Sequence, residues 1–228
     1  MPSSAPAAES VAPQALTRGH KKRERTRRGL VDAARRLIAR KEVGEIALFE
    51  VAAEAEVSNG TIYNYFRTRD EVLEAVGIAM ATEFSDTIST LSAEVHSGAQ
   101  RLSIGVRMFI GRAADDPPWA SALLRIIHFG QATRSRLAAH VLDDLREGRR
   151  EGAFVFEDIG IALDLVLSCT TGAMRAIVEG RMVAEHDIQV AEMILKALGA
   201  TPAKARKIAS LPLPALAAVD QDPDALTK

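Results

Sequence analysis

The sequence has little cysteine, few aromatic residues and no long hydrophobic run. Cys169 is the single cysteine, which excludes an intramolecular disulfide framework and disfavours a cysteine-rich zinc site. Phe, Trp and Tyr together make up 4% of the chain, which argues against a broad aromatic drug-binding cavity. No uncharged run of about eighteen apolar residues is present, so no membrane span is predicted. Because Met1–Leu16 also lacks the layout of a secretory signal, we expect a soluble, cytoplasmic protein without a membrane partner.

Motifs that carry catalysis are missing as well. Cys169 lies in an apolar segment, where a reactive thiolate is disfavoured. There is no glycine-rich phosphate loop and no Gly-x-Ser-x-Gly nucleophile elbow. The histidines have no metal-ligand spacing; they are His20, His96, His128, His140 and His186. The sequence therefore predicts no metal, no cofactor and no enzymatic activity.

Charge is unevenly distributed along the chain, although the net charge is −1. The segment from Arg18 to Asp70 holds thirteen Lys and Arg residues against eight Asp and Glu residues, a net of +5. The segment from Glu71 to Lys228 holds sixteen against twenty-one, a net of −5. A basic segment on a mildly acidic body is typical of a module that faces nucleic acid, although such an imbalance also arises by chance.

Helical periodicity dominates the chain between its two ends. In Thr26–Lys41, apolar residues recur at i, i+3, i+4, i+7 and i+8 from Leu30, and arginines fill the other faces. Strand signals are nearly absent. Further helices are expected over 46–55, 59–66, 69–91, 99–115, 117–130, 132–150, 156–181 and 185–199. The predicted fold class is all-α.

The two ends of the chain are rich in Ala and Pro and poor in large apolar residues. Such segments cannot bury enough apolar surface to offset the entropy lost on ordering. We therefore expect residues 1–20 to form a disordered tail. Residues 201–228 are expected to form a flexible tail, in which a short helix over 203–210 is the one regular element considered.

Two short helices joined by a tight turn, after a longer helix, are the layout of a helix-turn-helix motif. Its second short helix, here 59–66, enters the major groove of DNA. Short polar side chains there reach base edges or phosphates, phenol hydroxyls reach phosphates, and Gly60 allows a close backbone approach. The candidate DNA contacts are Asn59, Gly60, Thr61, Tyr63, Tyr65 and Arg69, and Ser58 is a good N-cap.

A run of basic residues precedes the first predicted helix. It contains Lys21, Lys22, Arg23, Arg25, Arg27 and Arg28. As an arm, it could follow the phosphates or enter the minor groove, as basic arms of other helix-turn-helix proteins do. The alternative is a solvated charge run that keeps the tail soluble. Its position beside the motif favours DNA contact.

The segment Val57–Phe66, with Arg69 and Val72-Leu73 after it, resembles the signature of the tetracycline-repressor (TetR) family. The resemblance covers roughly residues 25–75. It implies a homodimeric DNA-binding regulator, usually a repressor, that binds a palindromic operator and is released by a small ligand. It divides the chain into a three-helix helix-turn-helix DNA-binding domain, residues 21–70, and a larger helical ligand-binding and dimerisation domain, residues 71–200. By position it also gives Ser58 a DNA-contact role.

Two positions depart from the family's usual pattern. Ala47 and Leu48 stand where the family commonly places a threonine that caps the second helix and touches a phosphate. Loss of an N-cap costs about 1 kcal/mol. Glu56 stands where the family prefers glycine in the turn, and a left-handed backbone there would cost glutamate about 1 kcal/mol or more. Both changes are expected to weaken or redirect operator binding.

The last two long helices carry apolar residues that we expect at a dimer interface. The segment 156–181 is apolar over most of its circumference, and 185–199 has an apolar stripe. Pairing both helices with their copies across a two-fold axis would make a four-helix interface; the alternative is an intramolecular core. The candidate interface residues are Leu163, Leu167, Met174, Ile188, Ala191, Ile194, Leu195 and Leu198.

A ligand pocket leaves a weaker signal in the sequence. The large or polarisable residues that could line one are Phe109, Trp119, His128, Phe129, Cys169 and Met174, although a residue of this kind is more often ordinary core. The ligand itself stays unidentified. A ligand-independent DNA-binding or protein-partner module on the same fold remains the alternative function.

Overall fold

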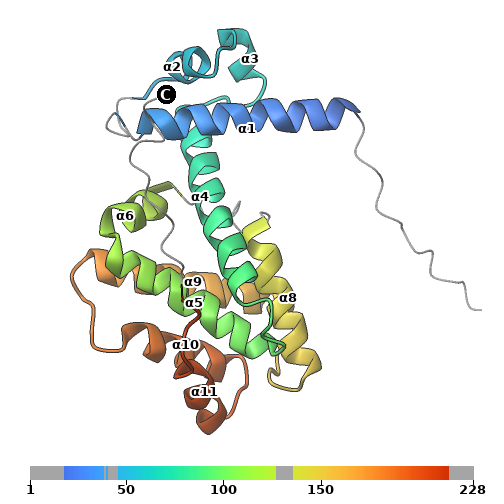
Figure 1. Ribbon diagram of the computed structural model, residues 1–228, viewed down its shortest axis with the longest axis vertical. Coiled ribbons are helices and arrows are strands. Elements are labelled where there is room, and N and C mark those ends of the chain that lie inside the picture. Colours follow the sequence, from blue (N-terminus) through green and yellow to red (C-terminus); the bar gives the residue numbers. More distant parts are fainter. Residues whose placement is uncertain (1–17, 39, 41–45, 127–135, 216–228) are drawn as a thin grey trace, which may run out of the picture. The chain divides into compact units, whose positions relative to one another are not determined.

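The computed structural model describes residues 18–38, 40, 46–126 and 136–215. All regular elements among these residues are helices, as the sequence predicts (Figure 1). The chain divides into two compact units, one ending at Arg69 and one beginning at Asp70.

The first unit contains α1 (Arg18–Ile38), α2 (Leu48–Glu54) and α3 (Asn59–Tyr63). Its core is small and uses the predicted apolar positions: Leu30, Ala33, Ala34, Leu37, Val51, Ala52, Ile62 and Phe66 are all buried. Because α2 packs against both α1 and α3, the two short helices are held on the longer one. Helix α1 begins at Arg18, eight residues before the predicted start. The basic run from Lys21 to Arg28 is therefore helical, and the prediction of an arm before the first helix is wrong.

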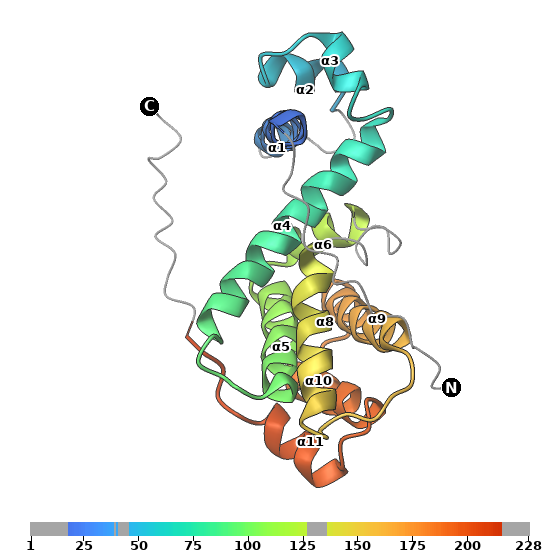
Figure 2. The same ribbon diagram turned by 90° about the vertical axis from the view of Figure 1, so that its right-hand side faces the viewer.

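The second unit is built around α5 (Gly98–Asp115), which lies beside α8 (Arg136–Arg150), α9 (Ile159–Val178) and α10 (His186–Ala197) (Figure 1 and Figure 2). Helix α4 (Arg69–Leu91) has the predicted bounds, and α6 (Pro117–Ile126) packs on α5 and α9. The main core includes Leu102, Val106, Leu145, Phe154, Val166, Ile194 and Leu195.

Helix α11 (Pro202–Ala209) occupies part of the segment expected to be a flexible tail. The Thr201 hydroxyl caps its start by accepting a hydrogen bond from the Lys204 backbone N–H at 3.4 Å. Ala205 and Ala209 are fully buried where α11 packs on α10 and α5. The buried face consists largely of alanines, whose small side chains do not distinguish a docked helix from an exposed one in the sequence. The structure thus differs from the expected tail over 201–215.

Helix α9 is long and apolar enough, by length and composition alone, to cross a membrane. It packs against α5, α6, α8 and α10, and Leu163, Val166 and Met174 are buried in this unit. Those contacts are typical of a core helix, so its composition is weak evidence for a membrane span.

Candidate nucleic-acid interface and ligand cavity

Helix α3 presents most of its polar residues on the surface of the first unit. Ser58 caps the helix by accepting from the Thr61 backbone N–H at 3.2 Å, and the Ser58 and Thr61 hydroxyl oxygens lie 2.9 Å apart. Ile62 is fully buried, whereas Tyr63 is 59% exposed. Asn59 and Gly60 are also exposed. A short helix held by one buried isoleucine therefore leaves its predicted DNA-contacting residues accessible.

Two arginines of α1 contact the chain just after α3. The Arg23 guanidinium lies 5.4 Å from the centroid of the Tyr65 ring, and its Nη2 donates to the Asn64 carbonyl oxygen at 3.4 Å. The Arg27 guanidinium lies 5.1 Å from the centroid of the Phe66 ring. Cation–π contacts of this kind contribute roughly 0.5–1 kcal/mol at exposed sites. The start of α1 therefore supports the chain around Tyr65.

The other predicted cationic residues lie on exposed surface. Lys21, Lys22, Arg25 and Arg28 are exposed on α1, and Arg69 is exposed at the first residue of α4. On α1, Lys21, Arg25 and Arg28 stand at i, i+4 and i+7 and therefore share one side of the helix, with Lys22 next to them. They can therefore face the same stretch of phosphates from a helix rather than from a flexible arm.

The two departures from the family pattern have visible structural consequences. Ala47 is the N-cap of α2 and offers no side-chain cap, but the Glu50 carboxylate accepts from the Ala47 backbone N–H at 3.0 Å. This bond supplies half of a capping box. Glu56 has φ of 55°, so the turn between α2 and α3 does use a left-handed backbone, at a glutamate. The conformational cost expected from the sequence therefore applies.

A salt-bridge cluster that the sequence analysis did not identify joins α1 to the end of α2. Glu54 accepts from Arg36 Nε and from Arg40 Nη2, both at 2.7 Å. The hydrogen bonds from Arg36 and then Arg40 lower the pKa of the Glu54 carboxyl. Arg36 lies on α1 and Arg40 lies two residues beyond its end, but their partner belongs to α2, which helical periodicity alone does not identify.

The second unit contains a cavity of about 220 Å³ lined by α4, α5, α6, α8 and α9. Of the predicted pocket residues, Phe109 and Met174 line it. Trp119 instead packs against the rings of Phe84 and Phe109, with centroids 5.7 and 6.3 Å away. Cys169 is exposed on α9 and does not line this cavity. His128 and Phe129 lie outside the described residues.

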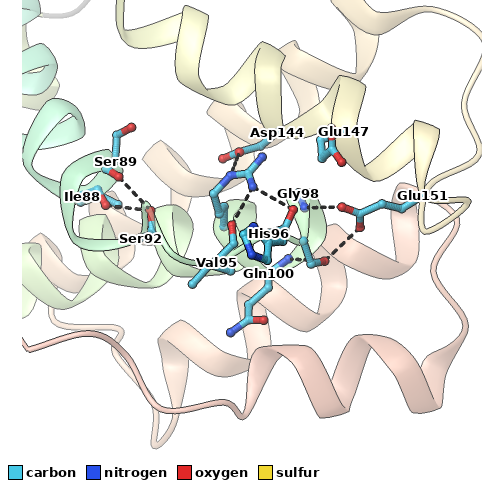
Figure 3. A network of polar contacts seen from close by, with 12 residues as sticks. Ile88, Ser89, Ser92, Val95, His96, Gly98, Gln100, Asp144, Glu147 and Glu151 are labelled. Atoms are coloured by element: carbon cyan, nitrogen blue, oxygen red, sulfur yellow. Dashed lines mark hydrogen bonds and ion pairs between the residues drawn. The ribbon is translucent and has the colours of Figure 1, made fainter.

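One end of the cavity is polar, and the sequence analysis assigned none of its residues to a pocket. Asp144 Oδ1 accepts from Arg101 Nε at 2.6 Å, and Arg101 Nη1 also donates to the carbonyl oxygens of Val95 and His96 (Figure 3). His140 Nε2 lies 2.7 Å from Asp86 Oδ1. Burial raises the pKa of Asp144 to about 6, against the opposing effect of Arg101. These pairs join residues 43 and 54 positions apart, too distant for sequence spacing to reveal.

The structure changes the choice of candidate interface residues. Most of them are buried in the chain's own core: Leu163, Met174, Ala191, Ile194, Leu195 and Leu198. Leu167 lines the cavity, and Ile188 is half-buried against the core. An apolar stripe cannot by itself distinguish a core from an interface. The outward side chains of α9 and α10 include Ile161, Cys169 and Met193, of which Ile161 and Met193 are 71% and 66% exposed.

A helix-turn-helix unit followed by a helical unit with a cavity defines a ligand-binding transcriptional regulator. Residues 30–76 match the model of the bacterial regulatory proteins of the tetR family. Residues 97–211, about half of the chain, match the tetracyclin repressor-like C-terminal domain. The chain belongs to the TetR family of transcriptional regulators.

Relatives and solved structures agree with this family. A Haemophilus influenzae HTH-type transcriptional regulator is 36% identical over 59 residues, and the Mycobacterium tuberculosis HTH-type regulator AlkX is 30% identical over 92 residues. These matches cover 26% and 40% of this chain and span less than half of either relative, 32% and 44% of their lengths. The crystal structure of RolR in complex with resorcinol superposes with a TM-score of 0.68 and 28% identity, covering 86% of this chain and 98% of RolR. The fold is also that of Thermus thermophilus FadR, solved with lauroyl-CoA, at a TM-score of 0.59 and 20% identity, covering 77% of this chain and 96% of that one.

Proposed function

We propose that this regulator is a homodimeric repressor in the cytoplasm. Each subunit would read one half of a palindromic operator with α3, and a small ligand in the cavity would release the DNA. The observation that carries the proposal is the exposed edge of α3, where Asn59, Gly60 and Tyr63 are accessible while Ile62 fixes the helix to its core.

Electrostatics support the same assignment. The segment from Arg18 to Asp70 has a net charge of +5, and Lys21, Lys22, Arg25 and Arg28 are exposed on α1. Each phosphate that such a residue neutralises contributes about −0.9 to the slope of log affinity against log salt concentration. Ser58, Thr61, Tyr65 and Arg69 complete the proposed contact set.

The outward face of α9 and α10 supports the dimer. Ile161 on α9 and Met193 on α10 are large apolar side chains that stay exposed on two neighbouring helices, where a second subunit would cover them. A second copy of the chain is the expected partner, because a palindromic operator has two equivalent half-sites. A two-fold dimer presents two reading helices to half-sites about 34–36 Å apart or a multiple of that spacing.

The cavity supports release by a ligand. It lies in the helical domain, and the related protein RolR was solved with the small aromatic molecule resorcinol. A ligand can only shift the equilibrium by its differential affinity for the DNA-bound and the released conformation. We therefore expect ligand and operator to weaken each other's binding by the same factor.

The first experiment is capture of fragmented genomic DNA from the source organism by the purified chain at moderate salt, followed by sequencing. Enrichment of a few fragments that share an inverted repeat is the expected result. Uniform, salt-sensitive retention would mean that the chain binds phosphates without reading bases. That result would contradict the proposal of a specific operator.

Variants then test the contacts on the recovered operator. Tyr63→Phe removes a phenol hydroxyl, and Arg69→Ala removes a cation; each is expected to lower affinity in an anisotropy titration. Unchanged binding by both variants would overturn the site assignment. A chain that reads an operator but responds to no small molecule would instead be a ligand-independent regulator.

A further inference from the structure

The cavity's polar end has no cation available for an anionic ligand among the described lining residues. The charge of Arg101 is paired with Asp144, and His140 contacts Asp86. Asp143, which also lines the cavity, pairs with Arg146 at 2.8 Å. The carboxylates of Asp143 and Asp144 outnumber the single guanidinium of Arg101 among the described lining residues. A carboxylate or phosphate ligand would therefore meet repulsion at this end of the cavity.

Three of the five hydroxyl groups that line the cavity donate their protons to backbone carbonyl oxygens. The Thr170 and Thr171 hydroxyls donate to the carbonyl oxygens of Val166 and Leu167, at 2.7 and 2.8 Å. The Ser92 hydroxyl donates to the Ile88 carbonyl oxygen at 2.8 Å. Each of these oxygens can still accept a hydrogen bond, and so can the second oxygen of Asp144, whose Oδ1 binds Arg101. The polar end therefore offers mainly acceptors, which a ligand must match with donors.

The remaining walls and the volume limit the ligand's size and shape. Apolar side chains form the rest of the lining, and they include Leu102, Val106, Phe109, Leu123, Val166 and Met174. A cavity of ~150 Å³ lined by such residues holds benzene. The 220 Å³ found here therefore suits one ring with small substituents. A polyol would leave hydroxyls without hydrogen-bond partners against the apolar walls, which disfavours its binding.

We infer that the cavity takes an uncharged single-ring phenol whose hydroxyl donates to Asp144, with Thr170 as a further acceptor. This inference rests on the proposed function, because it names the ligand class of the cavity that would release DNA. Asp144 would be the specificity-determining residue, because its carboxylate accepts a hydrogen bond from a ligand hydroxyl and repels a negatively charged ligand.

The test is calorimetric titration of the full-length protein with three matched probes near neutral pH. These are 1,3-dihydroxybenzene, its dimethyl ether 1,3-dimethoxybenzene, and benzoate. Hydrogen bonds to a charged acceptor lead us to expect about tenfold or more tighter binding of the dihydroxy probe than of the ether. Benzoate is expected to bind no better than the ether. Equal affinity for the first two probes, tighter binding of benzoate, or no binding of any probe would overturn the inference.

Variants identify the acceptor. Asp144→Asn should place an amide donor where the carboxylate was and reduce the preference for the dihydroxy probe to about threefold or less. Asp164→Asn removes the same charge at an exposed residue of α9 that does not line the cavity, and should leave the preference unchanged. Because Asp144→Asn also breaks the pair with Arg101, circular dichroism checks its fold. Thr170→Val, of nearly the same shape, provides a second variant that should weaken the dihydroxy probe more than the ether.

Operator binding by the same preparations separates this inference from the proposed function. If the protein binds its operator but not 1,3-dihydroxybenzene, only the inferred ligand class is refuted. If it binds 1,3-dihydroxybenzene with the expected preference but binds no operator, the ligand class holds and the proposed repressor function is refuted.

Discussion

Glu56 gives the clearest test of a single residue's conformation. Its φ of 55° lies in the left-handed region, where a residue with a Cβ atom is strained by about 1–2 kcal/mol. We expect Glu56→Gly to raise the free energy of unfolding by up to about 1 kcal/mol, because glycine loses the strain but also gains freedom in the unfolded chain. Urea denaturation measures this change. Glu157→Gly, at an exposed glutamate without positive φ, serves as the control and should not stabilise the protein.

Asp144 gives a pH dependence with a defined sign. Burial raises its pKa from the ordinary 3.8 to about 6, despite the charges of Arg101 and His140, and Asp143 acts in the same direction as burial. Between these pKa values the folded protein binds more protons than the unfolded chain. The contribution of Asp144 to the free energy of unfolding therefore falls as pH rises from about 4 to about 6, and stays constant above that range.

Denaturation curves of wild type and Asp144→Asn across this pH range measure the effect. The wild type should lose stability relative to the variant as pH rises from 4 to 6, and a constant difference would contradict the expected pKa. Phenol binding should change in the opposite direction, since the ionised carboxylate is the acceptor. We expect affinity for 1,3-dihydroxybenzene to rise through pH 6 and then level off.

At the scale of helices, α1 is expected to act on DNA in two ways. Arg23 and Lys22 are adjacent exposed cations, but only Arg23 contacts Asn64 and the Tyr65 ring in the described structure. If both cations approach phosphate, Arg23→Ala and Lys22→Ala should each reduce the magnitude of the salt slope of operator binding by about 0.9. Arg23→Ala should cost more affinity at any one salt concentration, because Tyr65 also loses its support. Equal losses in anisotropy titrations would show that the contact with Tyr65 does not matter.

Helices were predictable from the sequence where their apolar residues are large and periodic. Helix α4 has the predicted bounds, and the polar residues of α3 were located by the motif. The start of α1 was missed because its first turns are charged on every side, and its partners Tyr65 and Phe66 stand about forty positions away. The polar end of the cavity was missed for the same reason, since Arg101 meets Asp144 only after folding. The buried face of α11 is made largely of Ala205 and Ala209, whose small side chains do not distinguish a docked helix from a flexible tail.

At the scale of the whole molecule, α9 serves two surfaces at once. Val166, Thr170 and Met174 line the cavity, while Ile161 and Cys169 face outward. A ligand that moves the inner side of this helix would therefore also move its outer side, because side chains on both sides share one rigid backbone. If that outer side belongs to the dimer interface, occupancy of the cavity can change the spacing of the two reading helices without a separate transmitting element.

The dimer is tested by placing a charge on this outer face. Met193 on α10 and Ile161 on α9 are 66% and 71% exposed, so Met193→Glu and Ile161→Glu disturb no core of the single chain. Val155→Glu is the matched control, because Val155 is 76% exposed but lies on neither helix. Sedimentation velocity should show a dimer for the wild type and the control, and dissociation for the two interface variants. The same two variants should bind the operator at least tenfold more weakly, since a monomer engages one half-site alone.

Two outcomes would contradict this prediction. A wild type that sediments as a monomer would contradict the dimer itself. Interface variants that remain dimeric would place the two-fold contact on another surface, and Ile161 and Met193 would not have the role proposed for them.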